Sequence, residues 1–287
     1  MEYKLKREDL PNELFAKTLE VLCHAYGEMG ADVYVVGAAA RDIGLKLLQA
    51  GNPPRRTFDL DTAIRLNQWR EYDALAQTLL GKGFEKAPEK QRFYYCPEKD
   101  GPKYEIDIVP FGPIAPNEVV AWPPDGHPVM SVRCFSEVMQ AADVVHVDGL
   151  FHFRIASLSG QWLIKLDTWN DRHYQTSKDA SDMQFLLENA YIAFALSSDT
   201  LPGEVSIDAE HFDLTVAGAE WIASDLVRIL SEENRIAYAN MLEKEFMQKE
   251  SSALLNDLFD KAKKSTFDSL CRALGRMAQI LRAGVTQ

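Results

Sequence analysis

The chain has 287 residues, of which 46% are hydrophobic and 26% charged, a composition typical of a globular protein with enough apolar material for a core. This length predicts about two domains. The formal net charge of −12 excludes the broad basic surface of a general nucleic-acid binder, so a nucleic-acid partner would have to meet a local basic patch.

No stretch approaches the about 18 consecutive apolar residues that a membrane span requires. The charged opening segment MEYKLKREDLPNELF also lacks the apolar run of a signal peptide. The four cysteines (Cys23, Cys96, Cys134 and Cys271) are scattered without CxxC spacing, which is typical of a reduced cytosolic protein without a zinc site. We therefore expect a cytoplasmic protein with no membrane partner.

The first part of the chain predicts alternating helices and strands. Apolar residues recur with helical spacing over residues 11–30, and the β-rich run DVYVVG at 32–37 stops at a glycine. The next segment predicts a helix that Gly51 closes. A strand over 56–65 and a helix over 68–82 follow.

Further strands are predicted before the pattern becomes helical. RFYYCP and KYEIDIVPFG should pair across the polar turn EKDGPK, and proline-bearing loops such as AWPPDGHPVM follow. ADVVHVDGLFHFRIAS should form two strands that turn at Asp148 and Gly149. From residue 158 the pattern predicts helices at about 159–174 and 178–194, a polar linker, and more helices to about 284. A mixed α/β part is thus followed by an all-α part.

The segment TFDLDTAI at 57–64 places two aspartates, Asp59 and Asp61, in an otherwise apolar strand. Residues two apart on a strand point to the same face, so the two carboxylates should lie side by side. Two such charges repel unless a cation lies between them, and Mg²⁺ binds in proteins through one or two carboxylates plus substrate phosphates. The short motif alone favours the alternative, a strand end with solvated aspartates.

Two other segments change that preference. VVGAAARD puts Gly37 where a strand meets a helix, and the free N–H groups of a helix start suit phosphate binding. YEIDIVPFG puts Asp107 in a later apolar strand, where it could be a third metal ligand of a two-metal site. Read singly, Gly37 is a tight turn, Arg41 and Asp42 are a surface pair, and Asp107 is a hydrogen-bonded aspartate near a strand end.

In this order, the segments VVGAAARDIGL, TFDLDTAI and YEIDIVPFG resemble the nucleotidyltransferase core of the DNA polymerase β superfamily. The similarity is greatest to the bacterial AbiEii-like nucleotidyltransferases, the toxin family of type IV toxin–antitoxin pairs. Their second signature resembles LIKLDTWNDRHYQTSKDASDMQFLL, and the resemblance covers about residues 30–190. Ala38 departs from the family, which usually has serine or glycine there.

The second signature also makes physical sense on a helix. Lys165, Trp169 and Arg172 are spaced to share one helical face, which could hold a triphosphate by charge and a base by stacking. Asp179 and Asp182 share a face of the next helix. The alternative is a core tryptophan with interhelical salt bridges. The resemblance favours a functional role for Lys165 and Asp182 and leaves Trp169 and Asp179 open.

The resemblance implies an α+β fold, with a polymerase-β-like core of mixed sheet and flanking helices followed by an all-helical C-terminal part. We expect a nucleotidyltransferase core domain at 1–157 and a helical domain at 158–287. Within the latter, 158–195 should complete the active-site cleft and 196–287 should form a helical extension.

The resemblance also implies a metal-dependent enzyme that transfers NMP from an NTP, such as ATP, to a hydroxyl and releases pyrophosphate. The expected catalytic residues are Asp59, Asp61, Asp107 and Lys165, and the three aspartates should bind two Mg²⁺ ions. Gly37 and Ala38 should position the triphosphate. The expected nucleotide-binding residues are Gly37, Ala38, Arg41, Thr57, Lys165, Arg172 and Asp182.

The acceptor stays open at this point. The family suggests RNA, such as a tRNA 3′ end, or a protein side chain, and adds a cognate antitoxin to the candidate partners. A short RNA end could enter a local basic cleft near Arg41, Arg55, Arg56, Lys165 and Arg172. The alternatives are an aminoglycoside-type small-molecule nucleotidyltransferase, a CCA-adding or poly(A) polymerase head, and a non-catalytic nucleotide-binding module; the three retained carboxylates argue against the last.

Overall fold

The computed structural model of the protein describes residues 1–50, 59–98, 100–197, 201–202, 205–207 and 212–284. Thr57, Arg55, Arg56 and Gly51, which were singled out in the sequence, lie outside these residues. The chain divides into two compact units, Met1–Leu47 with Pro53–Ser157 and Leu48–Asn52 with Leu158–Gln287. The described residues include no helix long and apolar enough to cross a membrane.

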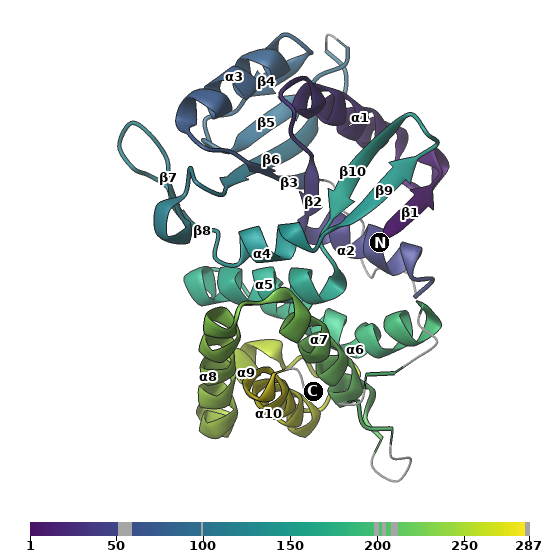
Figure 1. Ribbon diagram of the computed structural model, residues 1–287, viewed down its shortest axis with the longest axis vertical. Coiled ribbons are helices and arrows are strands. Elements are labelled where there is room, and N and C mark those ends of the chain that lie inside the picture. The colour runs from purple at the N-terminus through teal and green to yellow at the C-terminus, as the bar shows by residue number, and fades with distance from the viewer. Residues whose placement is uncertain (51–58, 99, 198–200, 203–204, 208–211, 285–287) are drawn as a thin grey trace. The chain divides into compact units, whose positions relative to one another are not determined.

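The first unit is built on an eight-stranded mixed sheet with the order β1-β9-β10-β2-β3-β6-β5-β4 (Figure 1). Its strands are β1 (Glu2–Leu5), β2 (Tyr34–Val36), β3 (Asp59–Arg65), β4 (Phe84–Lys86), β5 (Arg92–Tyr95), β6 (Tyr104–Phe111), β9 (Asp143–Val147) and β10 (Phe151–Ile155). The pairs β1–β9, β10–β2 and β3–β6 are parallel and the remaining neighbours are antiparallel. This confirms the predicted mixed sheet.

Among the described residues of this unit, four helices accompany the sheet: α1 (Glu13–Glu28), α2 (Gly37–Leu47), α3 (Trp69–Leu80) and α4 (Phe135–Gln140). Single 3-10 turns occur at η1 (Arg7–Asp9) and η2 (Pro116–Glu118). The segment AWPPDGHPVM, predicted as a loop, instead contributes to a two-stranded hairpin of β7 (Val119–Ala121) and β8 (Val129–Ser131). Each of these strands has only three residues beside a proline-rich turn, which is too short for a recognisable strand pattern in the sequence.

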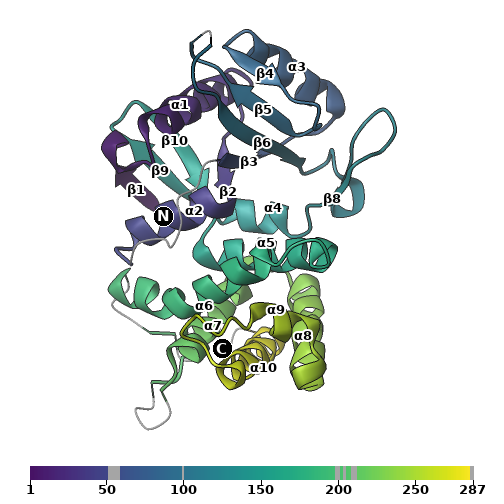
Figure 2. The ribbon, with the colours of Figure 1, turned by 180° about the vertical axis from the view of Figure 1, so that it is seen from behind.

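The central strands β3 and β6 have one apolar face and one polar face. Leu60, Ile106 and Ile108 are fully buried on the apolar face. Helices α1 and α3 lie next to each other over it (Figure 2). The hydroxyl of Tyr72 on α3 reaches the carbonyl oxygen of Ile108 at 3.5 Å. Since side chains alternate along a strand, Asp59, Asp61 and Asp107 point away from this core.

The second unit is helical in every regular element that the structure describes, which confirms the predicted all-helical C-terminal part. It contains α5 (Leu158–Arg172), α6 (Lys178–Ser197), α7 (Leu214–Ile229), α8 (Glu232–Gln248), η3 (Lys249–Ser251), α9 (Ala253–Leu258) and α10 (Phe267–Ala283). Helices α6 and α7 approach closely at Gly218, where an added Cβ would lie 2.2 Å from the carbonyl oxygen of Leu187.

Side-chain caps explain where several helices begin. Asn12 Oδ1 accepts from the backbone N–H of Phe15 at 2.8 Å and caps α1. Asp213, Ser231 and Thr266 cap α7, α8 and α10 in the same way. Each cap satisfies N–H groups that have no partner within the first helical turn.

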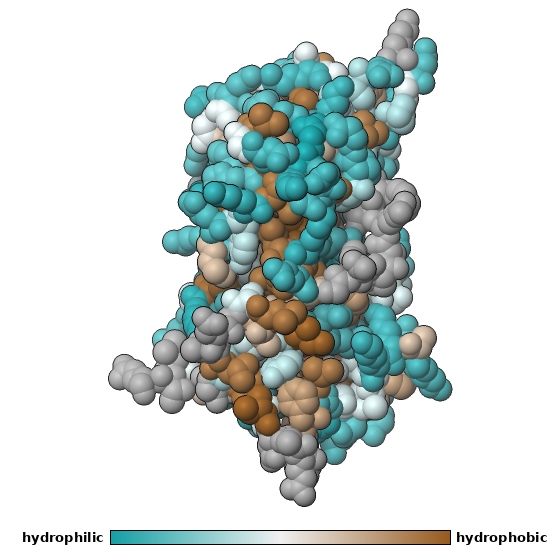
Figure 3. All heavy atoms as spheres, turned by 90° about the vertical axis from the view of Figure 1, so that its right-hand side faces the viewer, coloured by the Kyte–Doolittle hydropathy of each residue, from teal (hydrophilic) through white to brown (hydrophobic). Residues whose placement is uncertain are grey.

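Part of the helical unit exposes apolar side chains, and Figure 3 shows hydrophobic residues gathered on its surface. The exposed large apolar residues between the second half of α6 and the start of α7 are Ile192, Leu196, Leu201, Ile207, Phe212 and Leu214. A small cluster of Val205, Ala217 and Trp221 lies buried beside them, with Phe194 stacked on Trp221 at 5.3 Å between ring centroids.

Candidate active site

Four carboxylates share one face at the start of β3 and β6. In the parallel register of these strands, Asp59 lies opposite Glu105, and Asp61 lies opposite Asp107. Directly opposed residues on neighbouring strands point to the same face, and the strands lie about 4.8 Å apart. The register therefore gathers Asp59, Asp61 and Asp107 on one face of the central strands β3 and β6, with Glu105 beside them.

Gly37 brings the start of α2 against this group. Strand β2 runs antiparallel to β3 with Val36 opposite Asp61, so the chain enters α2 at the position of the carboxylate. Gly37 has a φ of +67°, a conformation that residues with a Cβ rarely adopt. A Cβ at this position would lie 2.1 Å from Asp61 Oδ2. The glycine is thus required both by the turn and by the close approach of Asp61.

Arg92 on β5 binds Asp107 through two hydrogen bonds. Arg92 Nε donates to Asp107 Oδ1 at 2.8 Å, and Nη2 donates to Oδ2 at 2.9 Å. The third guanidinium nitrogen, Nη1, lies 2.9 Å from Glu105 Oε1. The antiparallel register sets Arg92 directly opposite Asp107. One planar cation therefore spans two of the four carboxylates, in the bidentate geometry that arginine favours.

The charges of this group affect the pKa values of neighbouring side chains. Hydrogen bonding to Asp107, with the added charge of Glu105, outweighs the cost of burial and raises the pKa of Arg92 well above its usual value. Burial, followed by the negative charges of Asp59 and Asp61, raises the pKa of the Tyr104 hydroxyl far above its usual value of 10.0. Tyr104 is thus held neutral beside the acidic group.

The donor set suits a hard divalent cation, since Mg²⁺ prefers carboxylate oxygens. Asp59 is exposed and Asp61 is half-buried, so both carboxylates border solvent. Among the described residues, the side chains of three or more such ligands do not converge on one point as a metal centre would require. At Asp107, the guanidinium of Arg92 already binds both carboxylate oxygens. The predicted binding of two Mg²⁺ ions stays a prediction.

Arg41 lies on α2 but is not an open surface cation. It is 3% exposed, and its Nη2 lies 2.7 Å from Oδ1 of the adjacent Asp42. The interpretation as a surface pair is wrong for Arg41, which is buried, while Asp42 is half-buried. The helical turn directs Arg41 into the unit, where Asp42 offsets the cost of desolvating its charge. Ala38 is half-buried at the first turn of α2.

The second unit brings the other predicted residues together. Lys165 Nζ on α5 lies 2.8 Å from Asp179 and 3.0 Å from Asp182, both on α6. Arg172 donates to Asp179 through Nε at 2.9 Å and through Nη2 at 3.2 Å. Lys165, Arg172 and Asp182 are therefore neighbours in one interhelical cluster. Two cations face two carboxylates, so the cluster is balanced in charge.

Burial and ion pairing oppose each other in this cluster. Burial alone would lower the pKa of Lys165, but the charges of Asp182 and Asp179 outweigh it and raise that pKa above 10.5. Burial alone would raise the pKa of Asp179, but hydrogen bonds from Arg172 and Lys165 lower it below 3.8. Lys165 and Asp179 thus carry their charges at neutral pH.

Trp169 is a core residue in this unit. It is 4% exposed, and its Nε1 donates to Asp257 Oδ2 at 2.8 Å. The ring of His173 stacks on it with centroids 4.5 Å apart. The indole is therefore enclosed by its own unit rather than presented to a base.

Arg92 and Glu105 were not singled out in the sequence. Strand alternation puts Glu105 on the face of Asp107 two residues later, which is a usable signal. The position of Arg92 depends on the register between β5 and β6, because a shift of one residue would turn it to the opposite face. No local pattern in RFYYCP specifies that register.

Comparisons with known proteins give weak structural similarities. No protein-family model matches the sequence, and no curated protein is similar to it. An antigenic nucleotidyltransferase-like protein from Paracoccidioides brasiliensis has 17% identity and a TM-score of 0.41, over 78% of this chain and 89% of that one. JHP933 from Helicobacter pylori has 16% identity and a TM-score of 0.32, over 97% and 94% of the two chains. The Thermotoga maritima CCA-adding enzyme complexed with tRNA has 11% identity and a TM-score of 0.26, over 97% and 84%.

Proposed function

We propose that this protein is a metal-dependent nucleotidyltransferase that moves NMP from an NTP to a hydroxyl acceptor and releases pyrophosphate. The observation that carries the proposal is the opposition of Asp61 and Asp107 on neighbouring parallel strands, with Asp59 two residues before Asp61 and the backbone of Gly37 against its carboxylate. Acidic side chains on one face of two central strands, next to a glycine at a helix start, provide sites for a divalent cation and for phosphate.

In this proposal Asp59, Asp61 and Asp107 would hold Mg²⁺. When bound, Mg²⁺ would neutralise the charge that builds up on the phosphates. The start of α2, at Gly37 and Ala38, would orient the phosphates through backbone N–H groups. Asp107 would accept the proton of the acceptor hydroxyl. Such catalysis rests mostly on positioning and charge compensation.

Lys165, Arg172 and Asp182 enter the proposal as a second nucleotide-contacting group. Lys165 already has carboxylate partners at 2.8 and 3.0 Å. An ammonium offers three donors, so a phosphate would use the third donor beside these two carboxylates. We assign Arg41 a structural role instead, because its burial and its ion pair with Asp42 leave it poorly placed for a ligand.

For the acceptor we propose RNA, such as a tRNA 3′ end, or a protein side chain, as in the toxin of a toxin–antitoxin pair. The net charge of −12 limits any RNA contact to a short end rather than a long duplex. A small-molecule acceptor is the alternative within the same chemistry.

The test is incubation of the protein with each labelled NTP, Mg²⁺, and a mixture of cellular RNA and protein. We expect label in one band, which identifies both donor and acceptor, and no label with Asp59→Ala or Asp61→Ala. Circular dichroism of these variants should match the wild type. Labelling that survives in either folded variant would overturn the metal assignment.

One observation favours a second candidate function, a non-catalytic nucleotide-binding module. Arg92 holds both oxygens of Asp107, so this carboxylate is already neutralised without a metal. On that hypothesis the protein binds NTP with no Asp59-dependent turnover. Pyrophosphate release measured in the incubation above separates the two, because only the enzyme produces it.

A further inference from the structure

Arg92 makes more contacts in the acidic group than a surface ion pair requires. Each of its three guanidinium nitrogens meets a carboxylate oxygen at 2.8 or 2.9 Å, two on Asp107 and one on Glu105. The side chains of Arg92 and Asp107 are 26% and 19% exposed, so water screens their attraction only partly. The planar fork also fixes the direction of both carboxylates.

The charge balance of this face explains the need for such a cation. Asp59, Asp61, Glu105 and Asp107 are four carboxylates on two adjacent strands, and like charges directly opposite each other are destabilising. Arg92 is opposite Asp107 in the register and reaches Glu105 as well. The guanidinium of Arg92 therefore places a positive charge within this acidic group.

A divalent cation at Asp107 would meet the same two oxygens that Arg92 uses. The two cations would repel each other, and this repulsion is only moderately screened at a partly buried site. We propose that Arg92 is a resident counter-cation that competes with the metal for Asp107 and so sets the metal affinity of the site. This inference rests on the proposed function. It makes Arg92 a positioning residue, because Arg92 acts through Asp107 rather than on the substrate.

The competition has two measurable consequences. Removing the guanidinium should make the metal bind more tightly, because the metal no longer has a competing charge. It should also make the metal-free protein less stable, because the carboxylates then repel without compensation. A residue with a merely structural role would show the second effect without the first.

Mn²⁺ binding, followed by electron paramagnetic resonance of the free ion, tests the inference without any turnover. We expect Arg92→Met to bind Mn²⁺ on the order of tenfold more tightly than the wild type. Arg92→Lys keeps the charge and should stay close to the wild type. Arg92→Gln carries the same expectation as Arg92→Met if the latter does not fold.

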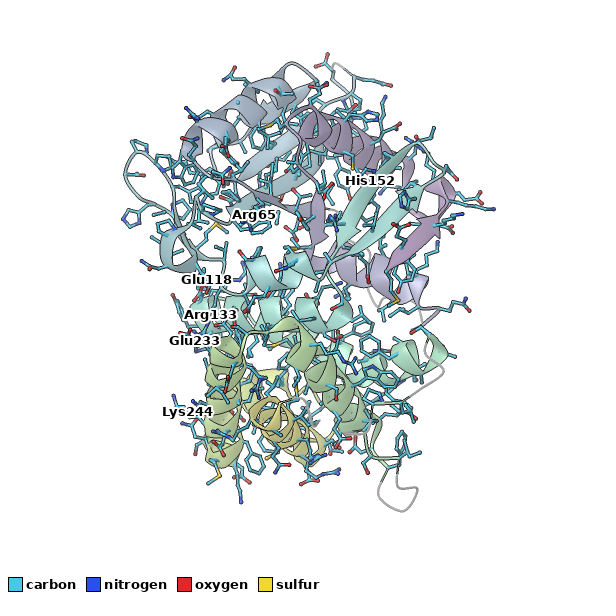
Figure 4. The ribbon with its side chains drawn as sticks, in the orientation of Figure 1. Arg65, Glu118, Arg133, His152, Glu233 and Lys244 are labelled. Carbon is cyan, nitrogen blue, oxygen red and sulfur yellow. The ribbon has the colours of Figure 1, made fainter. Side chains whose placement is uncertain are left out.

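Arg65 provides the matched control. It is exposed at the end of β3 away from Asp59 (Figure 4), about 13 Å from Asp61 at about 3.3 Å per residue. Arg65→Met removes the same charge and should change Mn²⁺ affinity little.

If the wild type binds Mn²⁺ and Arg92→Met binds it equally or less tightly, the inference is wrong and the proposed function stands. If neither protein binds Mn²⁺, both fall.

Discussion

Asp61 and Gly37 lie so close that the carboxylate fills the space where a side chain of residue 37 would begin. An added Cβ would be 2.1 Å from Asp61 Oδ2, far inside van der Waals contact, and 2.9 Å from the carboxyl carbon. The backbone of Gly37 is also in the left-handed region at a φ of +67°. The position of the Asp61 carboxylate on β3 therefore depends on the absence of a side chain at the start of α2.

Gly37→Ala should damage this arrangement in two ways. The left-handed conformation costs about 1–2 kcal/mol for a residue with a Cβ. The new methyl group must also push Asp61 out of place. We expect a lower melting temperature. We also expect a loss of nucleotidyl transfer at temperatures where the variant is still folded. Gly27→Ala is the control, because Gly27 lies within α1 with nothing near its Cβ position, and it should be neutral or stabilising.

Mg²⁺ should stabilise the protein, because a ligand that binds only the folded state shifts the unfolding equilibrium. At a concentration 100-fold above its Kd, the gain is about 2.7 kcal/mol. We expect differential scanning fluorimetry to show a higher melting temperature with Mg²⁺ than with EDTA. Asp61→Asn should abolish this difference, and in EDTA it should melt no lower than the wild type because it removes a repulsive charge. A Mg²⁺ shift that persists in Asp61→Asn would contradict the assignment of Asp61.

Asp179 should make stability depend on acid pH. Its folded pKa lies below the usual value of 3.8, so its ion pairs contribute fully above that value. Their contribution is lost as the pH falls below 3.8 and through the lower folded pKa. Asp179 is 1% exposed, and breaking a buried pair costs about 3–5 kcal/mol. We expect Asp179→Asn to be less stable than the wild type at pH 7 in urea titrations. Between pH 7 and pH 3 its free energy of unfolding should fall less than that of the wild type.

The exposed Asp171 on α5 serves as the control for that series. Asp171→Asn should change the free energy of unfolding by less than about 0.5 kcal/mol, as is usual for surface substitutions. Equal effects of the two substitutions at pH 7 would refute the structural role of Asp179. Lys165 acts at the other end of the pH scale, because its contribution is lost only as the pH rises through a folded pKa above 10.5.

Lys165→Ala should weaken NTP binding if Lys165 contacts phosphate. We expect on the order of a tenfold loss of affinity in calorimetry, which corresponds to about 1.4 kcal/mol. The neighbouring Lys178 is exposed at the start of α6, so Lys178→Ala should bind like the wild type. Unchanged NTP affinity in a folded Lys165→Ala protein would leave Lys165 with a structural role alone, as partner of Asp179 and Asp182.

Much of the first unit follows from local patterns in the sequence. The β-rich run ending in glycine and the apolar alternation around Asp59 and Asp61 predict β2, the turn into α2, and β3. The common face of the two aspartates follows from alternation along the strand. Their opposition to Glu105 and Asp107 is different, because it depends on pairing between segments more than 40 residues apart.

Side chains whose surroundings depend on tertiary packing escaped prediction. Helical spacing predicts that Lys165, Trp169 and Arg172 share a face, but it does not say whether that face is buried. Trp169 is enclosed with Asp257, which is 88 residues away. Arg41 is drawn inward by the packing of α2, and Arg92 reaches Asp107 only because β5 pairs in one register. Tertiary packing decides all three.

The strand order of the first unit has a consequence for folding on the ribosome. Strand β1 begins at Glu2, yet its parallel partner β9 begins at Asp143, and β2 gains its neighbour β10 only from Phe151 onward. The sheet therefore stays incomplete on one side until nearly all of this unit has been synthesised. During that time the edges of β1 and β2 offer unpaired backbone groups to other chains. We expect nascent chains that stop before residue 143 to depend on chaperones, while chains that extend beyond β10 can close their sheet.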